Sequence, residues 1–315
     1  MARILITGGS GFIGAGVARA LAARGDEVVV FDIARSRALE GVVREHPGVA
    51  FIGGEITEWP AVAAVMKEQR PDAVIHCAAV VGVTNSLASP YATFRVNVEG
   101  SLNVLECMRL FGVRRFVHLS SEETYGPFDA DVIDETHANR PLAPYGISKY
   151  AVEQLSRDYV ARYGLECLHV RTCWVYGPGL PRPRVPKILV DAAVAGTRLH
   201  LPGGGDFAVD HVYVDDCVDG IIRVLDKPKH THDVYHIATG EAHSLSSIVA
   251  MLKEIVPGAD LAAGPGPYRF VDGTEAVRKG ALDIARARRE LGYAPRYPMK
   301  KGLAAYVEAT RAGRG

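Results

Sequence analysis

Apolar positions at the start of the chain follow first a strand pattern and then a helical one. Residues 3–6, Arg-Ile-Leu-Ile, form a short apolar run. Ile13, Val17 and Leu21 then recur at every fourth position, which places them on one face of a helix. Residues 28–31, Val-Val-Val-Phe, are a continuous apolar run, as is typical of parallel strands covered on both faces. We therefore expect a strand, a helix and a second strand parallel to the first.

The same alternation continues through the first half of the chain. Strand-like apolar runs are separated by segments with helical spacing, such as residues 61–66, 90–110 and 145–164. The further apolar runs lie at residues 49–52, 73–75, 116–119, 167–170 and 234–237. Repeated strand-helix units form a parallel sheet with helices on both faces. The expected fold class is therefore α/β, a doubly wound parallel sheet of the Rossmann type.

A glycine-rich turn directly follows the first strand. Within Thr-Gly-Gly-Ser-Gly-Phe-Ile-Gly, residues 7–14, the spaced glycines permit a tight turn and a close approach of backbone N–H groups to phosphates. Asp32 ends the second strand, where a carboxylate contacts the adenosine ribose hydroxyls and repels a 2′-phosphate. The pattern predicts a dinucleotide site that prefers NAD. Arg35 and Arg37 lie just beyond and leave NADP as the alternative.

Composition restricts the other partners. The 315 residues include 36 Lys plus Arg and 36 Asp plus Glu, so no excess charge favours nucleic acid or an anionic membrane. No apolar stretch reaches the length of about 18 residues that a transmembrane helix needs. The apolar start leads into the glycine turn and does not resemble a signal peptide. We expect a cytoplasmic protein with a small-molecule substrate.

Neither the cysteines nor the histidines follow the spacing of a metal site. The five cysteines are widely spaced and contain no C-x-x-C pair, which also argues against disulfides. His230, His232 and His236 are the only clustered histidines, and no set of carboxylates or cysteines completes a ligand pattern beside them. We expect no bound metal.

Tyr145 and Lys149 are one turn apart on the helix predicted to begin near Pro144. A nearby ammonium favours the phenolate of a tyrosine, which can then take a hydroxyl proton as hydride leaves the same carbon. Ser121 follows a strand at the carboxyl edge of the sheet and can donate a hydrogen bond to the reacting oxygen. The alternatives are a surface tyrosine with a solvated lysine, and a serine that only ends a strand. The dinucleotide motif upstream favours the catalytic interpretation.

Several further segments match one pattern of motifs. They are HCAA at residues 76–79, NVEGSLNVLE from 97, SSEETYG from 120, YGISK from 145, VYGPG from 175, VYVDD near 215 and LDIARARRELGY from 282. Together with the glycine turn they resemble the extended short-chain dehydrogenase/reductases, most closely the NAD-dependent epimerase/dehydratase family of sugar-nucleotide enzymes. The resemblance spans nearly the whole chain and implies an NAD-dependent enzyme. It also implies a homodimer that pairs the helices beginning at Pro90 and Tyr145.

The resemblance implies roles for individual residues around the cofactor. Lys149 also holds the nicotinamide ribose, and Asn97 lies on the helix behind the site, where a capping or buried polar role is the alternative. Glu55 occupies a position where the family usually has Asp. The other implied residues are Gly8, Gly11, Gly14, Phe12 and Ile13 at the pyrophosphate, Asp32 and Ile33 at the adenosine, Glu55 and Ile56 at the adenine, and Ala78 and Ala79 beside the cofactor.

The character of the chain changes after Val175. Residues 177–184 and 202–205 are rich in Gly and Pro, which interrupt regular structure. We expect the chain to leave the sheet there, to rejoin it near residues 212–214 and to leave it again after Gly240. The expected division is an NAD-binding domain of residues 1–175, rejoined by about 210–238, and a smaller C-terminal substrate-binding lobe of residues 176–209 and 239–315.

The substrate half departs from the family pattern. Relatives that bind a nucleoside diphosphate sugar usually have Asn in place of Trp174, Arg in place of Val209, and an Arg-x-Gly-Asp element in place of residues 268–273. A diphosphate needs charge-assisted donors, which guanidinium groups supply best. These losses favour a smaller substrate, such as a free sugar, a sugar acid or a hydroxy acid. Other basic residues that could rebuild a phosphate site are Arg182, Arg184, Lys187, Arg269 and Arg278, so a nucleotide sugar is the alternative.

Three reactions share a first step, the oxidation of a secondary alcohol by NAD with Tyr145 as the base. Release of the ketone gives a dehydrogenase, and return of hydride to its other face gives an epimerase. A dehydratase would use Glu123, which matches the basic residue of sugar-nucleotide 4,6-dehydratases, to remove a proton before water leaves. Alternatively Glu123 hydrogen-bonds a substrate hydroxyl or a loop amide. An NAD-sensing binding protein would predict a broken Tyr/Lys pair, and here the pair is intact.

Overall fold

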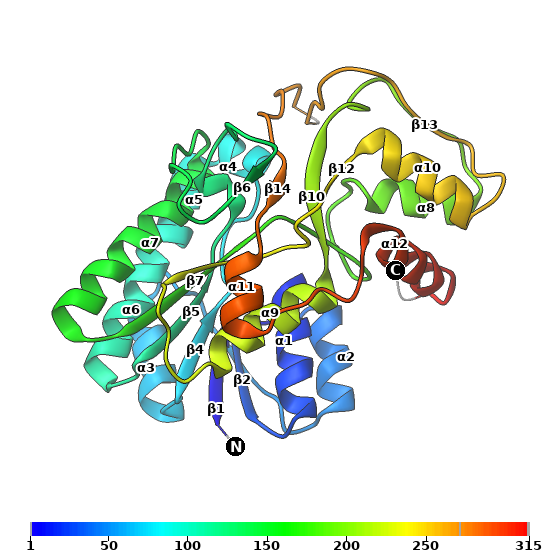
Figure 1. The fold of residues 1–315 in the computed structure, drawn as a ribbon. Helices are drawn as coiled ribbons and strands as arrows, with labels where there is room; N and C mark the ends of the chain where they lie inside the picture. Colours follow the sequence, from blue (N-terminus) through cyan, green and yellow to red (C-terminus); the bar gives the residue numbers. More distant parts are fainter. Residues whose placement is uncertain (1, 271, 314–315) are drawn as a thin grey trace. The chain divides into compact units, whose positions relative to one another are not determined.

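The computed structural model describes residues 2–270 and 272–313, and a seven-stranded sheet forms the centre of its first unit. The spatial order is β11-β7-β5-β4-β1-β2-β3 (Figure 1). The strands are β1 (Arg3–Thr7), β2 (Glu27–Asp32), β3 (Ala50–Gly53), β4 (Ala73–His76), β5 (Arg115–Leu119), β7 (Glu166–Thr172) and β11 (Val234–Ile237). β1 pairs in parallel with β2 and β4, and β5 pairs in parallel with β4 and β7. The chain thus winds outward from β1 in both directions, which confirms the doubly wound α/β fold.

Helices cover both faces of this sheet. In Figure 1, α3, α6 and α7 lie on one side of it and α1 and α2 on the other. Buried side chains of α3, α6 and α7 share a hydrophobic cluster with inward-facing strand residues such as Leu5, Val74 and Phe116. The helices are α1 (Phe12–Ala23), α2 (Arg37–Glu45), α3 (Trp59–Gln69), α4 (Val83–Ala88), α5 (Pro90–Phe94), α6 (Gly100–Phe111), α7 (Pro144–Tyr163) and α9 (Val214–Asp226).

The helix expected over residues 90–110 contains one irregular turn. α5 continues into the π-helical turn η1 (Arg95–Glu99), and α6 follows directly. A π turn holds one extra residue, and such turns are frequent at functional sites. Hydrophobic spacing does not distinguish a single π turn from an α-helix, so the sequence did not predict it.

Close contacts divide the chain into two compact units. The first comprises the chain up to residue 126, residues 138–171 and residues 218–235, and the second comprises residues 127–137, 172–217 and the chain from 236 onward. Relative to the expected division, segments 127–137, 172–175, 210–217 and 236–238 lie in the second unit. The elements of the second unit are β6 (Val132–Ile133), β8 (Trp174–Tyr176), α8 (Lys187–Ala195), β9 (Leu199–Leu201), β10 (Ala208–Tyr213), β12 (Ala242–Ser244), α10 (Leu245–Ile255), β13 (Leu261–Ala263), β14 (Ala281–Leu282), α11 (Ala285–Leu291) and α12 (Met299–Arg311).

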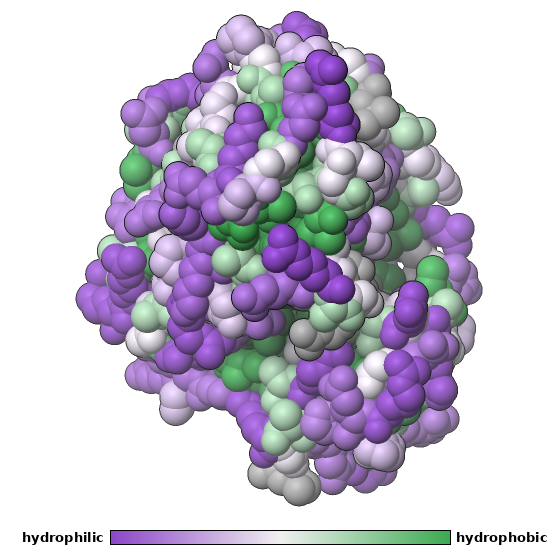
Figure 2. Space-filling model, turned by 90° about the vertical axis from the view of Figure 1, so that its right-hand side faces the viewer, coloured by the Kyte–Doolittle hydropathy of each residue, from purple (hydrophilic) through white to green (hydrophobic). Residues whose placement is uncertain are grey.

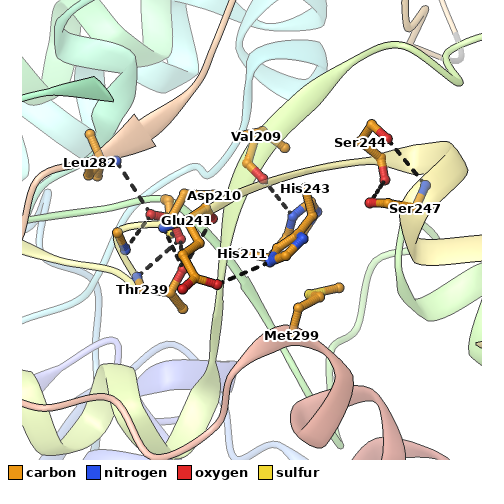
Figure 3. A network of polar contacts seen from close by, with 12 residues as sticks. Val209, Asp210, His211, Thr239, Glu241, His243, Ser244, Ser247, Leu282 and Met299 are labelled. Carbon is orange, nitrogen blue, oxygen red and sulfur yellow. Dashed lines mark hydrogen bonds and ion pairs between the residues drawn. The ribbon is translucent and has the colours of Figure 1, made fainter. Parts of the chain in front are cut away.

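The expectation that residues 212–214 rejoin the central sheet is wrong. Val212 and Tyr213 end β10, and Val214 begins α9. β10 pairs in parallel with β8 and antiparallel with β12 in a three-stranded sheet. Asp210 supplies the physical reason, because its buried carboxylate accepts hydrogen bonds from the N–H groups of Thr239, Gly240 and Leu282 (Figure 3). A buried carboxylate requires such donors, and these fix β10 to the turn before β12 and to β14.

Hydrophobic side chains are unevenly distributed over the surface. The face drawn in Figure 2 is mainly hydrophilic, and its hydrophobic residues form small areas between the polar ones. Among the described residues, most of the large exposed hydrophobic side chains lie on α4 to α7: Leu87, Tyr91, Phe94, Leu102, Leu110, Phe111, Ile147, Val160 and Tyr163. None of the helices in the described ranges is long and apolar enough to cross a membrane.

Candidate active site

Two glycines of the turn between β1 and α1 have no room for a side chain. Gly8 has a φ of +70°, and a Cβ there would lie 2.4 Å from the backbone N of Ala78. A Cβ on Gly14 would lie 2.3 Å from the carbonyl oxygen of Gly8. Within the same turn the buried hydroxyl of Ser10 has no hydrogen-bond partner among the described residues. A tight turn with an unused donor at a helix N-terminus fits a pyrophosphate.

The side chain of Asp32 lies against the glycine turn. One carboxylate oxygen accepts a hydrogen bond of 2.9 Å from Ser10 N–H, and the other accepts one of 2.7 Å from Ile33 N–H. The carboxylate is therefore held at the carboxyl end of β2, beside the glycine turn. The guanidinium of Arg35 lies over the Phe51 ring, 5.0 Å from its centroid. These positions fit a dinucleotide whose ribose hydroxyls approach Asp32.

The remaining residues implied for the cofactor do not all lie together in the structure. Phe12 and Ile13 begin α1 and are partly buried, and Ala78 and Ala79 follow β4 next to the glycine turn. Ile33 is 72% exposed, and the exposed Glu55 accepts a hydrogen bond from the Thr57 hydroxyl. Ile56 is buried, and its side chain occupies the space beside Gly100 of α6 in the hydrophobic cluster. The glycine turn, Asp32 and the two alanines come together, whereas Ile56 faces the core.

Tyr145 and Lys149 lie in the first two turns of α7, on its buried side. Lys149 is 3% exposed, and its Nζ lies 6.0 Å from the centroid of the Tyr145 ring. The same Nζ donates a hydrogen bond of 2.7 Å to the carbonyl oxygen of Leu119 at the end of β5. Burial lowers the pKa of Lys149 to about 8. The ammonium is thus fixed between the strand end and the phenol.

The segment after β5 packs directly against this part of α7. Ser121 caps the short 3₁₀ turn η2 (Glu122–Thr124), because its Oγ accepts a hydrogen bond of 3.1 Å from Glu123 N–H. A Cβ on Gly146 would lie 2.3 Å from the carbonyl oxygen of Glu123, so only glycine allows this approach. The glycine of the YGISK motif therefore brings Ser121 and the partly buried Glu123 next to the start of α7.

Asn97 joins the cofactor side of the site to α7. It is the buried residue of the η1 turn, and its side-chain amide makes two hydrogen bonds with the backbone of Val80, of 2.7 and 3.0 Å. Its Nδ2 also donates to the Ser148 hydroxyl, which in turn donates to the carbonyl oxygen of Tyr145. Asn97 therefore has a buried polar role that positions the loop after β4 and the first turn of α7.

In the second unit, Trp174 and Tyr268, two of the residues that depart from the family pattern, lie in an aromatic cluster. Trp174 and His211 are neighbours in the β8–β10 pairing, with ring centroids 5.6 Å apart. The Trp174 ring also lies 5.7 Å from the rings of Phe207 and Tyr268. The guanidinium of Arg184 lies over Trp174, 4.8 Å from the ring centroid. We call these five residues the Trp174 cluster.

Comparison with known proteins gives the family. The family model described as the NAD dependent epimerase/dehydratase family matches residues 4–238. The chain belongs to this family. It is therefore an enzyme with NAD as its cofactor, as the glycine turn predicts, and the fit of the turn to a pyrophosphate agrees with this.

Relatives in the family catalyse more than one reaction. A UDP-glucose 4-epimerase of Mycolicibacterium smegmatis is 31% identical over 315 residues, which cover 98% of each chain. A dTDP-glucose 4,6-dehydratase of Streptomyces antibioticus is 32% identical over 99% of this chain and 93% of its own. The crystal structure of UDP-glucose 4-epimerase from Thermotoga maritima with UDP-glucose has a TM-score of 0.89 and 32% identity, covering 99% of each chain.

Sequence reasoning missed a group of buried polar residues beneath Lys149. His76, His118 and His169 are all buried, and so are Glu153 on α7 and Arg171 on β7. The three histidines lie on neighbouring strands of the sheet. The sequence does carry one signal for them, because each histidine directly follows consecutive apolar residues of a predicted strand. Which strands are neighbours is a property of the fold, however, and the individual segments do not encode it.

Proposed function

We propose that this enzyme oxidises a secondary alcohol of a sugar-like substrate. The observation that carries the proposal is the buried ammonium of Lys149 beside Tyr145. In that position it stabilises the phenolate, which takes the proton of the substrate hydroxyl. The Ser121 hydroxyl donates a hydrogen bond to the reacting oxygen and holds it near the phenol. Bound NAD supplies the hydride acceptor for this chemistry, and the residues that would hold it are those of the glycine turn, Asp32 and Lys149.

For the substrate we propose a free sugar, a sugar acid or a hydroxy acid, with release of the oxidised product. The Trp174 cluster supports this choice, because aromatic rings occupy it where a diphosphate would need several guanidinium donors. Val209 is buried and apolar at a position where the family resemblance implies Arg. The second unit is then the part of the chain that selects the substrate.

A nucleotide sugar is the second candidate. The relatives named above are a UDP-glucose 4-epimerase and dTDP-glucose 4,6-dehydratase, and Arg184 of the Trp174 cluster supplies one cation for a phosphate. On such a substrate the Tyr145 chemistry would serve 4-epimerisation, in which hydride returns and no NADH accumulates. The position of Glu123 against Gly146 next to Tyr145 supports 4,6-dehydration as a further candidate.

Two substrate panels distinguish these reactions. The protein is incubated with NAD and either free sugars, sugar acids and hydroxy acids, or UDP-, GDP- and dTDP-sugars. The proposal expects NADH to accumulate, by its absorbance, with a member of the first panel. A new epimer of a nucleotide sugar without net NADH would overturn it in favour of the epimerase. Formation of a 4-keto-6-deoxy sugar that Glu123→Gln abolishes would assign the dehydratase.

We also propose a homodimer formed through α5, α6 and α7. The support is the exposed Tyr91, Phe94, Leu110 and Tyr163, since exposed apolar side chains gathered on neighbouring helices mark interaction surfaces. Sedimentation equilibrium is expected to give twice the mass of the 315-residue chain. A monomer at micromolar concentration, or a dimer unaffected by Tyr91→Glu together with Phe94→Glu, would contradict this interface.

A further inference from the structure

Three buried histidines occupy equivalent positions on neighbouring strands. His76 of β4 is paired in register with His118 of β5, and His118 is paired with His169 of β7. All three side chains point to the same face of the sheet, because residues in register in parallel strands share a face. That is also the face on which Lys149 meets β5. Buried polar rings require partners, so each nitrogen can be examined for the hydrogen bond it makes.

Both ring nitrogens of His76 have hydrogen-bond partners other than Lys149. The Ser101 hydroxyl gives its hydrogen to the carbonyl oxygen of Asn97, so it accepts from His76 Nε2, 2.8 Å away. His76 Nδ1 then accepts from the hydroxyl of Thr7 at 2.6 Å. His76 is therefore neutral and fixed in one tautomer, and burial lowers its pKa to about 3. It has a structural role in the sheet.

His118 differs, because it lies between Lys149 and His169. Its Nε2 is 3.5 Å from Lys149 Nζ, and its Nδ1 is 3.2 Å from His169 Nδ1. An ammonium can only donate, so His118 Nε2 must carry the lone pair and Nδ1 the hydrogen. His169 must then accept at Nδ1 and carry its hydrogen on Nε2, for which the described residues supply no hydrogen-bond partner. With Lys149 charged, this is the only arrangement of two neutral imidazoles that makes both the Lys149–His118 and the His118–His169 hydrogen bond.

The groups around Lys149 indicate why an acceptor at His118 Nε2 matters for its charge. Its titratable neighbours are Cys77, His76 and His118 on the strand side and Tyr145 and Glu153 on α7. Burial and the charge of Lys149 hold the pKa of His118 well below its usual value, so the ring stays neutral and keeps its lone pair. Burial at the same time opposes the charge on Lys149. The charge of Glu153 favours the ammonium, and among the described residues the carbonyl of Leu119 and the imidazole of His118 lie within hydrogen-bond distance of Nζ as acceptors.

We propose that His118, held in one tautomer by His169, is a positioning residue that keeps Lys149 charged and directed at Tyr145. His118 does not reach the reacting atoms, and it acts through the ammonium. This inference rests on the proposed role of Lys149 beside Tyr145. It adds that the basicity of the site depends on a residue of β5 that lies in the core of the sheet.

The tautomer is measured directly in the protein without substrate. Long-range ¹H–¹⁵N spectra of the uniformly labelled protein are expected to show His118 neutral at pH 7, with its hydrogen on Nδ1. A hydrogen on Nε2 would overturn the proposal, because that nitrogen could no longer accept from Lys149. This measurement needs no variant and no catalysis, so its result does not depend on the identity of the substrate.

The second measurement is the titration of Lys149, followed by its ¹³Cε and ¹⁵Nζ shifts. His118→Leu removes the acceptor and is expected to raise the acid dissociation constant of Lys149 by about three- to tenfold. His118→Gln keeps an acceptor near Nε2 and is expected to stay near the native value. His76→Gln is the matched control, since it changes a buried histidine that makes no hydrogen bond to Lys149. Equal titration in the native protein and His118→Leu would overturn the proposal.

Folding of the variants does not limit the test. If His118→Leu fails to fold, the tautomer of the native protein and the titration of Lys149 in His118→Gln still test the proposal. A strongly changed acid dissociation constant of Lys149 in His118→Gln would contradict the acceptor role of His118. A failed search for a substrate would leave the Lys149 titration intact. The failure of this inference is therefore distinguishable from the failure of the proposed function.

Discussion

Arg171 and Glu153 form an ion pair inside the first unit, with Arg171 Nη2 2.5 Å from Glu153 Oε2. The side chains are 1% and 0% exposed. Glu153 also accepts a hydrogen bond from the hydroxyl of Ser120, and the Arg171 guanidinium lies over the Tyr125 ring. The pair therefore holds α7, β7 and the segment after β5 together, directly below the site.

Removing one partner of this pair is expected to destabilise the protein strongly. Glu153→Ala leaves the buried guanidinium of Arg171 without its carboxylate, and we expect a loss of about 3–5 kcal/mol in the free energy of unfolding. Urea denaturation measures it. Asp158→Ala, which breaks the exposed pair with Arg162 on the same helix, is the control and is expected to cost at most about 1 kcal/mol. Equal losses in the two variants would contradict a structural role for the buried pair.

Tyr145→Phe tests the proposed base. The change removes the phenol oxygen and keeps the ring, so we expect turnover to fall by about 10²–10⁴-fold. NAD affinity, measured by calorimetry, is expected to remain close to native because the glycine turn is untouched. Tyr163→Phe, at the exposed end of α7, serves as the control. Retained turnover in Tyr145→Phe would remove Tyr145 from its assigned role.

The buried Lys149 predicts a stability that depends on pH. Its pKa is lowered by burial from 10.5 to about 8, so between these values the unfolded chain binds the proton and the folded chain does not. Stability contributed by this residue therefore rises with pH across that window. The free energy of unfolding of the native protein minus that of Lys149→Met is expected to rise by about 2–3 kcal/mol as the pH rises between these two pKa values. A constant difference between the two proteins would show that Lys149 titrates normally.

Gly146→Ala is expected to displace the segment that carries Ser121 and Glu123. The new Cβ would clash with the Glu123 carbonyl oxygen, and relief of that clash costs about 1–3 kcal/mol. Urea denaturation is the readout, with turnover measured on the same samples. Gly41→Ala on α2 is the control, because a Cβ there has ordinary space and alanine favours a helix. A Gly146→Ala protein as stable and active as Gly41→Ala would contradict the close contact.

Asp32→Ala is expected to weaken the preference for NAD over NADP. The carboxylate accepts from two backbone N–H groups at the end of β2, and at that position it would bind ribose hydroxyls and repel a 2′-phosphate. Calorimetric titration with both dinucleotides gives the ratio of the two affinities. Asp72→Ala, at the other end of the sheet, is the control. An unchanged ratio would mean that Asp32 does not select the cofactor.

The cofactor half of the molecule could be predicted from sequence because its signals are local. Gly8, Gly14 and Asp32 lie within one strand-helix-strand unit, and the Tyr145–Lys149 spacing lies within one helix. Each is set by backbone geometry that short segments encode. The family match confirms NAD as the cofactor and the parallel sheet confirms the α/β fold, while the roles of these individual residues stay predictions.

The features that could not be predicted from the sequence depend on contacts between segments that are distant in the chain. His118 and His169 become neighbours only when β5 pairs with β7, and Asp210 meets Leu282 only in the folded second unit. The assignment of residues 212–214 to the central sheet failed for this reason, because an apolar run predicts a strand and not its partners. Ile56 likewise fits both an adenine contact and a core position by sequence, and its side chain packs in the core.

The π turn at Arg95–Glu99 sets the orientation of every residue that follows it on α6. An α-helix rotates by about 100° per residue, so the extra residue in this turn shifts the following face by that angle. Ser101 reaches His76 and Asn97 reaches Ser148 within this arrangement. A one-residue deletion here would leave a regular helix of nearly the same length and composition. It would turn the Ser101 hydroxyl away from the sheet, so the hydrogen bond between Ser101 and His76 depends on the number of residues that precede Ser101 in this helix.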